Sequence, residues 1–287
     1  MSDWDEQRSA PPCEITEQPN PRTQDLDRLP LEEVLERILE EDACVPEVVR
    51  RGLPAILAAA EALLEVLRSG GRWFNLGAGT SGRIGVLDAA EIPPTFGLEP
   101  DRVQGVIAGG AAALERAIEG AEDHPENAAA ELDQRGLSAG DALVAISASG
   151  RTPYTLGGVR YARRVGARTV GVTCTPGSPL AEEVELPVVI VVGPEVLAGS
   201  TRMKGGLAQK MVLHSLSTAV MARLGRVRGN RMSEIRGVTR KLQTRAVITL
   251  SSIGGIPLDE AERRLNEVGG SLREALDRVE SERSSRG

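Results

Sequence analysis

Residues 73–83, WFNLGAGTSGR, decide the fold, because a short apolar run there ends in a glycine-rich loop that opens a helical pattern. The same order recurs in residues 142–152, ALVAISASGRT. Strands that are apolar throughout are typical of a parallel sheet with helices on both faces. Both stretches therefore predict a strand, a loop and a helix within a doubly wound α/β layer.

Short β-rich runs alternate with helical patterns along the middle of the chain. The predicted strands are Trp73–Leu76, Val103–Ala108, Ala142–Ser147, Thr169–Thr173 and Val188–Val192, and the helices between them are Ser81–Ile92, Ala112–Ala121, Pro153–Val165 and Pro179–Val184. Because crossovers between parallel strands are right-handed, this alternation predicts one five-stranded, doubly wound parallel sheet.

Three segments are expected along the chain. Residues 1–25 are polar without periodicity and predict an N-terminal tail. Residues 26–228 contain the sheet, with helical stripes at 31–38 and 48–63 before it and a long helix, Thr201–Leu224, after it. Residues 229–287 show no strand signal, and three further stripes predict a small all-helical subdomain at 235–247, 258–268 and 272–279.

Composition narrows the class of protein. The chain has 287 residues, 41% hydrophobic and 26% charged, as expected of one or two globular domains. Only 2% of the residues are aromatic and the net charge is −7, which argues against a nucleic-acid partner. Cys13, Cys44 and Cys174 have no disulfide or zinc spacing, and no apolar stretch resembles a signal peptide or a membrane span. We therefore expect a cytoplasmic protein with no membrane partner.

The two glycine-rich loops predict a binding site for a phosphorylated small molecule. Ligands of open parallel sheets bind at the carboxyl ends of the strands, where loops lead into helix N-termini. Glycines let the backbone approach an anion there, and free N–H groups and hydroxyls donate hydrogen bonds to it. The hydroxyl residues expected to bind phosphate or sugar oxygens are Thr80, Ser81, Ser147, Ser149 and Thr152.

Gly77, Gly79 and Gly82 also have the spacing of the dinucleotide fingerprint, which is a competing interpretation. That fingerprint expects an acidic residue at the end of the next strand, where this chain has Gly109 and Gly110. A dinucleotide also leaves the second loop without a role. Two hydroxyl-rich loops favour a sugar phosphate, and the remaining alternative is that both loops are only tight turns.

The motifs around these loops resemble a known family. Ser147-x-Ser149-Gly150-x-Thr152 resembles the phosphate loop of sugar isomerase (SIS) domains. Within that group the chain is similar to N-acetylmuramic acid 6-phosphate etherases, from about Thr16 to beyond Arg245. The matching stretches are 16–17, 20–21, 25–27, 77–83, 88–91, 93–97, 107–110, 119–123, 193–197 and 199–204.

The resemblance implies hydrolysis of the lactyl ether of N-acetylmuramic acid 6-phosphate, by elimination and then hydration. The products implied are N-acetylglucosamine 6-phosphate and D-lactate, in the recycling of cell-wall amino sugars. It also implies a homodimer and no metal or organic cofactor. Two alternatives stay open: a non-catalytic SIS module that senses a sugar phosphate, and an aldose–ketose isomerase.

By motif match, the proton donor of the family falls on Glu91 and its second active-site carboxylate on Glu122. Glu91 shares a helical stripe with Ile84 and Leu87 and is expected in the last helical turn before Pro93. Apolar surroundings and a helix C-terminus both favour the protonated form of a carboxyl group. Glu122 stands in a run of acidic residues, and its assignment depends on the resemblance alone.

The segment around the long helix adds further candidates. Lys204, in the first turn of that helix, is expected to face an anion, because a lysine is unfavourable there for purely structural purposes. Ser200 or Thr201 is expected to cap the helix. Glu195 is either a third carboxylate of the site or a turn residue, and His214 is expected to be buried and hydrogen-bonded.

Overall fold

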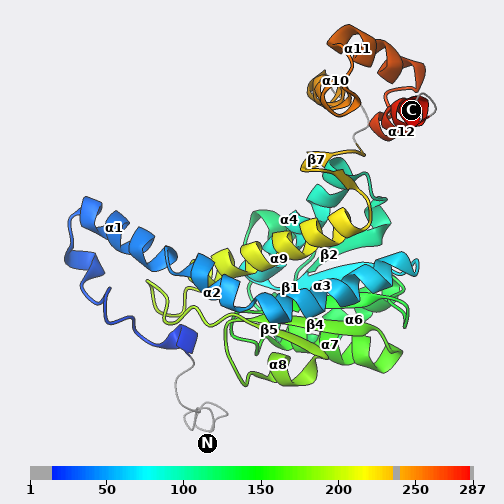
Figure 1. Cartoon of the computed structure of the whole chain (residues 1–287). Helices are drawn as coiled ribbons and strands as arrows, with labels where there is room; N and C mark the ends of the chain where they lie inside the picture. Colours follow the sequence, from blue (N-terminus) through cyan, green and yellow to red (C-terminus); the bar gives the residue numbers. More distant parts are fainter. Residues whose placement is uncertain (1–14, 235–239, 285–287) are drawn as a thin grey trace, which may run out of the picture. The chain divides into compact units, whose positions relative to one another are not determined.

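A five-stranded parallel sheet forms the centre of the protein in a computed structural model, which describes residues 15–234 and 240–284 (Figure 1). The strands are β1 (Trp73–Gly77), β2 (Val103–Ile107), β3 (Ala142–Ile146), β4 (Arg168–Thr173) and β5 (Leu186–Val189). They are hydrogen-bonded in the order β2-β1-β3-β4-β5, and every pairing is parallel. The predicted doubly wound sheet is confirmed, with the last strand beginning two residues earlier than expected.

The helices before and between the strands are α1 (Leu31–Asp42), α2 (Val45–Arg51), α3 (Leu53–Arg68), α4 (Gly79–Phe96), α5 (Ala112–Glu115), α6 (Pro125–Gln134), α7 (Pro153–Val165) and α8 (Pro179–Glu183), and α9 (Lys204–Arg223) follows the sheet. Short 3-10 helices lie at Ile15–Glu17, Leu26–Arg28, Pro100–Arg102 and Ala121–Asp123. Helices α3 and α4 cover one face of the sheet and α6, α7 and α8 the other (Figure 1).

Three helices differ from the expectation. The predicted helix at 48–63 is divided at Gly52 into α2 and α3. The predicted helix at 112–121 is only the four-residue α5, and α6 was not predicted at all. Its sequence, PENAAAELDQ, buries only Ala128 and Leu132, so its apolar stripe was too short to recognise.

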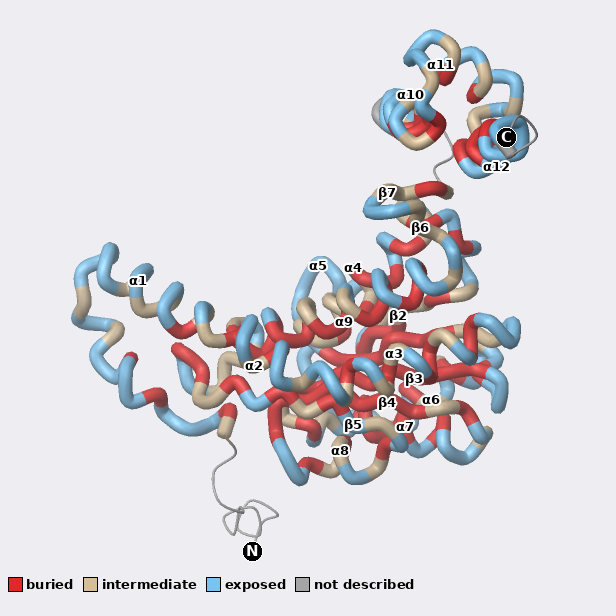
Figure 2. The backbone as a smooth tube through the Cα atoms, viewed as in Figure 1, coloured by how far each residue is buried: buried red, intermediate tan, exposed pale blue. Residues whose placement is uncertain are grey.

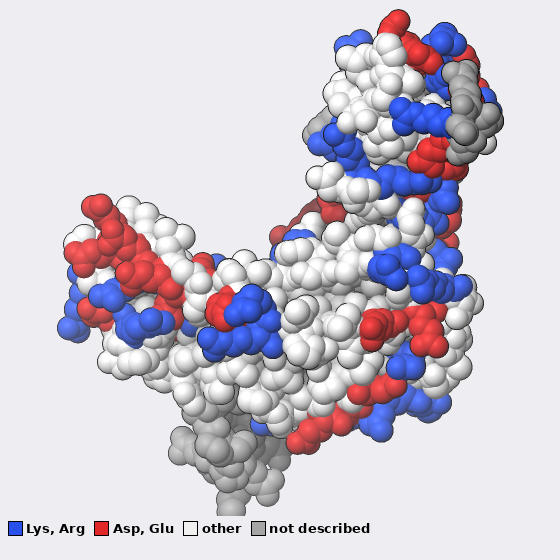
Figure 3. Space-filling model, viewed as in Figure 1, with Lys and Arg blue, Asp and Glu red and all other residues white. Residues whose placement is uncertain are grey.

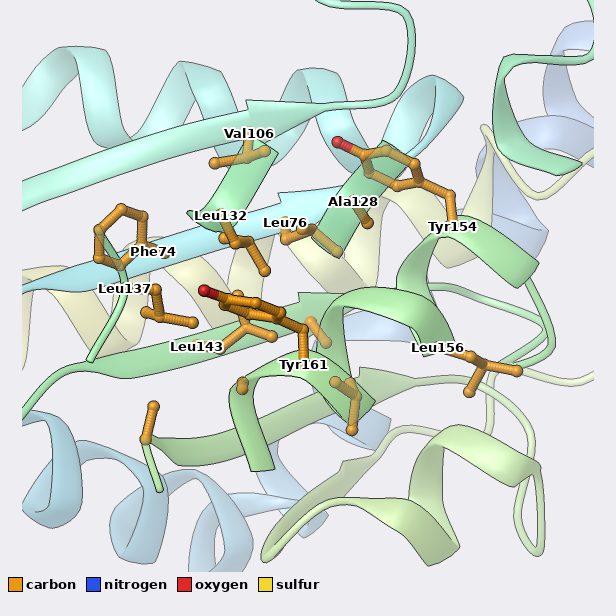
Figure 4. Close-up of a cluster of buried hydrophobic side chains, with 14 of the residues drawn as sticks. Phe74, Leu76, Val106, Ala128, Leu132, Leu137, Leu143, Tyr154, Leu156 and Tyr161 are labelled. Carbon is orange, nitrogen blue, oxygen red and sulfur yellow. The ribbon is translucent and has the colours of Figure 1, made fainter. Parts of the chain in front are cut away.

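The main hydrophobic core lies between the sheet and helices α6 and α7 (Figures 2 and 4). Leu76 and Leu143 of the sheet face Tyr154 and Tyr161 of α7, and all four side chains are buried. The Tyr154 hydroxyl donates a hydrogen bond of 2.9 Å to the carboxylate of Glu131 on α6, and Tyr161 bonds Asp133 in the same way at 2.6 Å. These two bonds satisfy the polar ends of large buried rings and fasten α6 to α7.

The described residues form two compact units. The first comprises residues 15–89 and 102–217, and the second comprises 90–101, 218–234 and 240–284. Helices α4 and α9 each contribute residues to both units. In no described part of the chain is a helix long and apolar enough to cross a membrane.

The second unit contains β6 (Val227–Arg228), β7 (Arg231–Met232), α10 (Arg240–Gly254), α11 (Leu258–Glu267) and α12 (Leu272–Ser284). The three helices bury a core of their own, in which Leu250, Leu265 and Leu276 are almost fully buried. The predicted C-terminal helical region is thus present, although β7 is a short strand where no strand was expected. Ile235 and Val238, expected to begin a helix, lie outside the described residues.

Candidate active site

The first glycine-rich loop joins β1 to α4 and has no room for a side chain at two of its glycines. A Cβ on Gly77 would lie 2.9 Å from the nitrogen of Gly82 and 2.9 Å from the carbonyl oxygen of Ile146. A Cβ on Gly82 would lie 2.6 Å from the carbonyl oxygen of Gly77. Gly79 has a φ of +51° and open space beside it, so a ligand has access to the backbone there. Thr80 and Ser81 follow in the first turn of α4, both half-buried.

The second loop joins β3 to α7 and gathers three hydroxyl groups. The Oγ of Ser147 lies 2.9 Å from the Oγ1 of Thr152 and 3.4 Å from the Oγ of Ser149. The same Oγ accepts a hydrogen bond from the N–H of Gly150, whose φ is +68°. Thr152 is the residue before α7, yet its side chain does not cap that helix. The first amides of α7 therefore remain available to an anion bound by these hydroxyls.

The start of α9 lies against both loops in the first unit. A Cβ added to Gly205 would lie 3.4 Å from the Cβ of Ala148, in the second loop. A Cβ added to Gly206 would lie 3.3 Å from the Cγ2 of Thr80, at the first loop. Because β1 and β3 are neighbours in the sheet, the two loops share its carboxyl edge, and the first turn of α9 packs beside them.

A pocket adjoins the first loop and includes Glu122. It lies between the loop, the end of β2 and the segment before α6, and its lining comprises Ala78, Gly79, Arg83, Ala108, Ala113 and residues 117–122. Glu122 is exposed on a 3-10 turn, and Glu119 shares the lining with it. Arg83 donates a hydrogen bond of 3.2 Å to the carbonyl oxygen of Arg116. The lining of the pocket thus includes two acidic residues, one arginine and Gly79.

Glu91 is placed differently from the expectation. Helix α4 does not end before Pro93 but continues through Pro93 and Pro94 to Phe96, so Glu91 is not in its last turn. The stripe that contains it faces outward, because Leu87 is 47% exposed and Glu91 is exposed as well. Glu91 belongs to the segment 90–101 of the second unit. The expected apolar surroundings of this carboxyl are therefore absent from the described part of this chain.

Lys204 does not face an open anion site. Its side chain is only 2% exposed, and its Nζ lies 2.6 Å from the Oε2 of Glu41 at the end of α1. Lys204 was expected to bind an anion of the ligand, whereas the anion beside its ammonium in the structure is the carboxylate of Glu41. Glu41 was not recognised from the sequence, since nothing in the acidic run of α1 distinguishes it from its exposed neighbours.

Glu195 caps the long helix. Its carboxylate accepts the backbone N–H of Lys204 at 2.9 Å and that of Gly205 at 2.8 Å, so Ser200 and Thr201 do not have the expected role. Burial raises the pKa of Glu195, and these two hydrogen bonds oppose that effect. Helix α9 accordingly begins at Lys204, three residues later than predicted.

Three further residues of α9 interact with Asp88 on α4. The Ser217 hydroxyl donates a hydrogen bond of 3.0 Å to the carboxyl of Asp88, which is buried. Burial raises the pKa of Asp88, while the bond from Ser217 and the charges of Lys210 and His214 lower it. His214 itself is exposed, not buried as expected.

Comparison with known proteins decides the family. Residues 55–163 match the model of the glucokinase regulatory protein N-terminal SIS domain, and residues 125–219 match the SIS domain model. The chain is 49% identical, over 91% of its length, to an N-acetylmuramic acid 6-phosphate etherase of Rubrobacter xylanophilus, of which it covers 87%. The chain belongs to the N-acetylmuramic acid 6-phosphate etherase family. An etherase of Rhodopirellula baltica is 47% identical over the same share of the chain and 86% of its own length.

Etherase-family membership confirms the resemblance found in the motifs, and solved structures confirm the fold. A phosphoheptose isomerase from Francisella tularensis matches with a TM-score of 0.53 at 19% identity, over 68% of this chain and all of that one. One from Neisseria gonorrhoeae matches with a TM-score of 0.51 at 17% identity, over 67% of this chain and all of that one. At such identities the likeness concerns the SIS fold alone.

Proposed function

We propose that this protein cleaves the lactyl ether of N-acetylmuramic acid 6-phosphate, a carbon–oxygen lyase reaction that yields N-acetylglucosamine 6-phosphate and D-lactate. The observation that carries the proposal is the 49% identity to an etherase over 91% of the chain. The two hydroxyl-rich loops support it, because they suit a phosphorylated sugar. The context we infer is the catabolism of amino sugars from peptidoglycan.

The second loop binds the 6-phosphate in this proposal. Ser147, Ser149 and Thr152 supply hydroxyl donors, and the uncapped first turn of α7 supplies amides and the positive end of the helix dipole. Hydrogen bonds from neutral donors to an anion are shorter and stronger than those between neutral groups. Thr80 and Ser81 contact sugar oxygens from the first loop.

The chemistry requires groups that exchange protons with the sugar. Opening of the pyranose ring places an aldehyde at C1, which acidifies the C2–H bond. A base removes the C2 proton, the electron pair forms the C2=C3 double bond, and the C3–O bond breaks as an acid protonates the departing lactyl oxygen. Water then adds its oxygen to C3 and a proton returns to C2. Each transfer is general acid–base catalysis by a positioned carboxyl group.

Glu91 is the proton donor and Glu122 the second carboxylate in this proposal. Their position in the motifs of the etherase family supports both roles. For Glu122 the pocket adds support, because this residue lines the same pocket as Gly79 of the first loop. We also propose that the protein is a cytoplasmic homodimer, as its family resemblance implies.

The test is the reaction in water enriched in heavy oxygen. Purified protein is incubated with N-acetylmuramic acid 6-phosphate, and both products are analysed by mass spectrometry. Label at C3 of the sugar, with unlabelled lactate, is the expected result. Label in the lactate would contradict elimination, and binding of the sugar phosphate without release of lactate would indicate a sensor. Conversion to another sugar phosphate without lactate would indicate an isomerase.

A further inference from the structure

A buried ion pair joins the end of α1 to the start of α9. The Nζ of Lys204 lies 2.6 Å from the Oε2 of Glu41, and each residue is only 2% exposed. Arg22 approaches the other carboxylate oxygen of Glu41 from the exposed side. The remaining glutamates of α1 are exposed, and Figure 3 shows acidic side chains on its outer surface. Glu41 is therefore the one described glutamate of this helix whose side chain is buried.

This pair lies where helix energetics would not favour a lysine. The first turn of a helix carries a partial positive charge, which repels the ammonium of Lys204. Burial of two ions also costs several kcal/mol before their attraction offsets it. Burial alone would raise the pKa of Glu41, but the hydrogen bond and the charge of Lys204, together with Asn20 and Arg22, outweigh it, and the pKa is lowered. The carboxylate is thus held in its charged form.

The N-terminal segment makes further hydrogen bonds with the loop that leads into α9. The Thr23 hydroxyl donates to the carbonyl oxygen of Val196 at 2.7 Å, and the Asn20 side chain donates to that of Pro194 at 3.3 Å. The backbone N–H of Gly199 donates to the carbonyl oxygen of Thr16 at 2.9 Å. Residues 16–41 therefore hold both the loop at 194–199 and the first turn of α9.

That first turn of α9 is in contact with both ligand loops. A Cβ on Gly205 would lie 3.2 Å from the Oε1 of Glu195 and 3.4 Å from the Cβ of Ala148, and one on Gly206 would lie 3.3 Å from the Cγ2 of Thr80, so a side chain at either position requires a neighbour to shift. We expect a shift of Lys204 to displace this turn relative to both loops, and a misplacement of about 1 Å can change activity by about a hundredfold.

We propose that Glu41 is a positioning residue which, through Lys204, sets the first turn of α9 against the two loops and so sets the affinity for the sugar phosphate. The inference rests on the proposed function, because it assigns those loops to the phosphorylated substrate. Glu41 itself touches no substrate.

The experiment compares Glu41→Gln with Glu40→Gln, an exposed neighbour on the same helix. Each variant is measured for KM and kcat of lactate release, for the Kd of N-acetylglucosamine 6-phosphate by calorimetry, and for the rate of tryptic cleavage after the exposed Arg202. All measurements are made where circular dichroism shows the variant to be folded. Glu41→Asp, which keeps the charge on a shorter stem, is the conservative variant.

We expect Glu41→Gln to raise KM and Kd about tenfold or more, with kcat within about threefold, and to speed cleavage after Arg202. Glu41→Asp lies between it and the wild type, and Glu40→Gln equals the wild type. If Glu41→Gln does not fold, Thr23→Val, which removes the hydroxyl that bonds the carbonyl oxygens of Val196 and Asn20, shows a smaller rise in KM and faster cleavage. A folded variant with unchanged KM, Kd and cleavage overturns the inference. If the wild type releases no lactate, the proposed function is wrong. The Kd values and the cleavage rates then still test the inference about Glu41.

Discussion

The Oγ of Ser147 lies 2.9 Å from the Oγ1 of Thr152, which links the first residue after β3 to the residue before α7. Ser147 also accepts the N–H of Gly150, so one buried hydroxyl organises the whole second loop. In the proposed function, a phosphate bound by these hydroxyls would replace their contacts with one another by charge-assisted hydrogen bonds.

We predict that Ser147→Ala weakens binding of N-acetylglucosamine 6-phosphate by about tenfold to a hundredfold, because a hydrogen bond to a charged group contributes about 1.5–3 kcal/mol. Thr152→Val has the same direction, and Thr152→Ser, which keeps the hydroxyl, stays near the wild-type Kd. Calorimetric titration of each variant measures these constants. Equal affinity in Thr152→Val and Thr152→Ser would show that the hydroxyl does not contact the phosphate.

A second prediction concerns the backbone of the same loop. A Cβ on Gly150 would collide with the side chain of Ser178 and lie 2.9 Å from the Oγ1 of Thr173, at a φ of +68°. Gly177 has a similar φ, +64°, with open space beside it. Gly150→Ala therefore suffers both strain and collision, whereas Gly177→Ala suffers strain alone.

We expect Gly177→Ala to lower the free energy of unfolding by about 1 kcal/mol and Gly150→Ala by at least about 2 kcal/mol more. Urea unfolding followed by circular dichroism measures both values. The comparison separates the two causes, because only the collision differs between the variants. Similar losses in the two variants would mean that Ser178 moves aside at little cost.

The sheet and its loops could be predicted well because the sequence patterns of strands and glycine-rich loops are local. Each strand is an apolar run between breakers, and each loop carries glycines whose positive φ or close packing the structure shows at Gly79 and Gly150. The ends of β1, β3 and β4 consequently fall within one residue of the prediction. The spacing of the two loops along the chain was enough to place both at one edge of a parallel sheet.

The roles of Lys204, Glu195 and His214 were not predictable in the same way, because they depend on contacts between distant segments. Lys204 meets Glu41 across 163 positions, and no local pattern marks either partner. Glu195 caps α9 from a loop outside the helix, a role that the usual capping position does not reveal. For Glu91 the prolines suggested a helix end that the structure does not have.

The carboxylate variants test the proposed chemistry directly. Glu91→Gln and Glu122→Gln are each expected to lower kcat for lactate release by about a hundredfold to ten-thousandfold, since a glutamine neither gives nor takes a proton. The controls are Glu99→Gln and Glu115→Gln, at exposed glutamates near Glu91 and Glu122 in the sequence, and both should retain the wild-type rate. Lactate is followed enzymatically. A wild-type rate in Glu91→Gln would remove it as the proton donor.

A last prediction follows from the buried carboxylate of Asp141, the residue before β3. Burial alone would raise its pKa, but hydrogen bonds from the Arg72 guanidinium and backbone, and from Ser138, outweigh that effect and lower the pKa below its usual 3.8. Because the folded-state pKa lies below the unfolded one, this carboxylate contributes stability above about pH 4, and the contribution is lost as the pH falls through the folded-state pKa.

We expect Asp141→Asn to lower the free energy of unfolding by about 2 kcal/mol at pH 7, because Arg72 loses its charged partner. The difference between variant and wild type should shrink steadily below pH 4, as protonation removes the same charge from the wild type. Urea unfolding at a series of pH values measures this convergence, and Asp27→Asn, at an exposed aspartate, is the control. A difference that stayed constant down to pH 2 would mean that packing around Asp141, and not its charge, provides the stability.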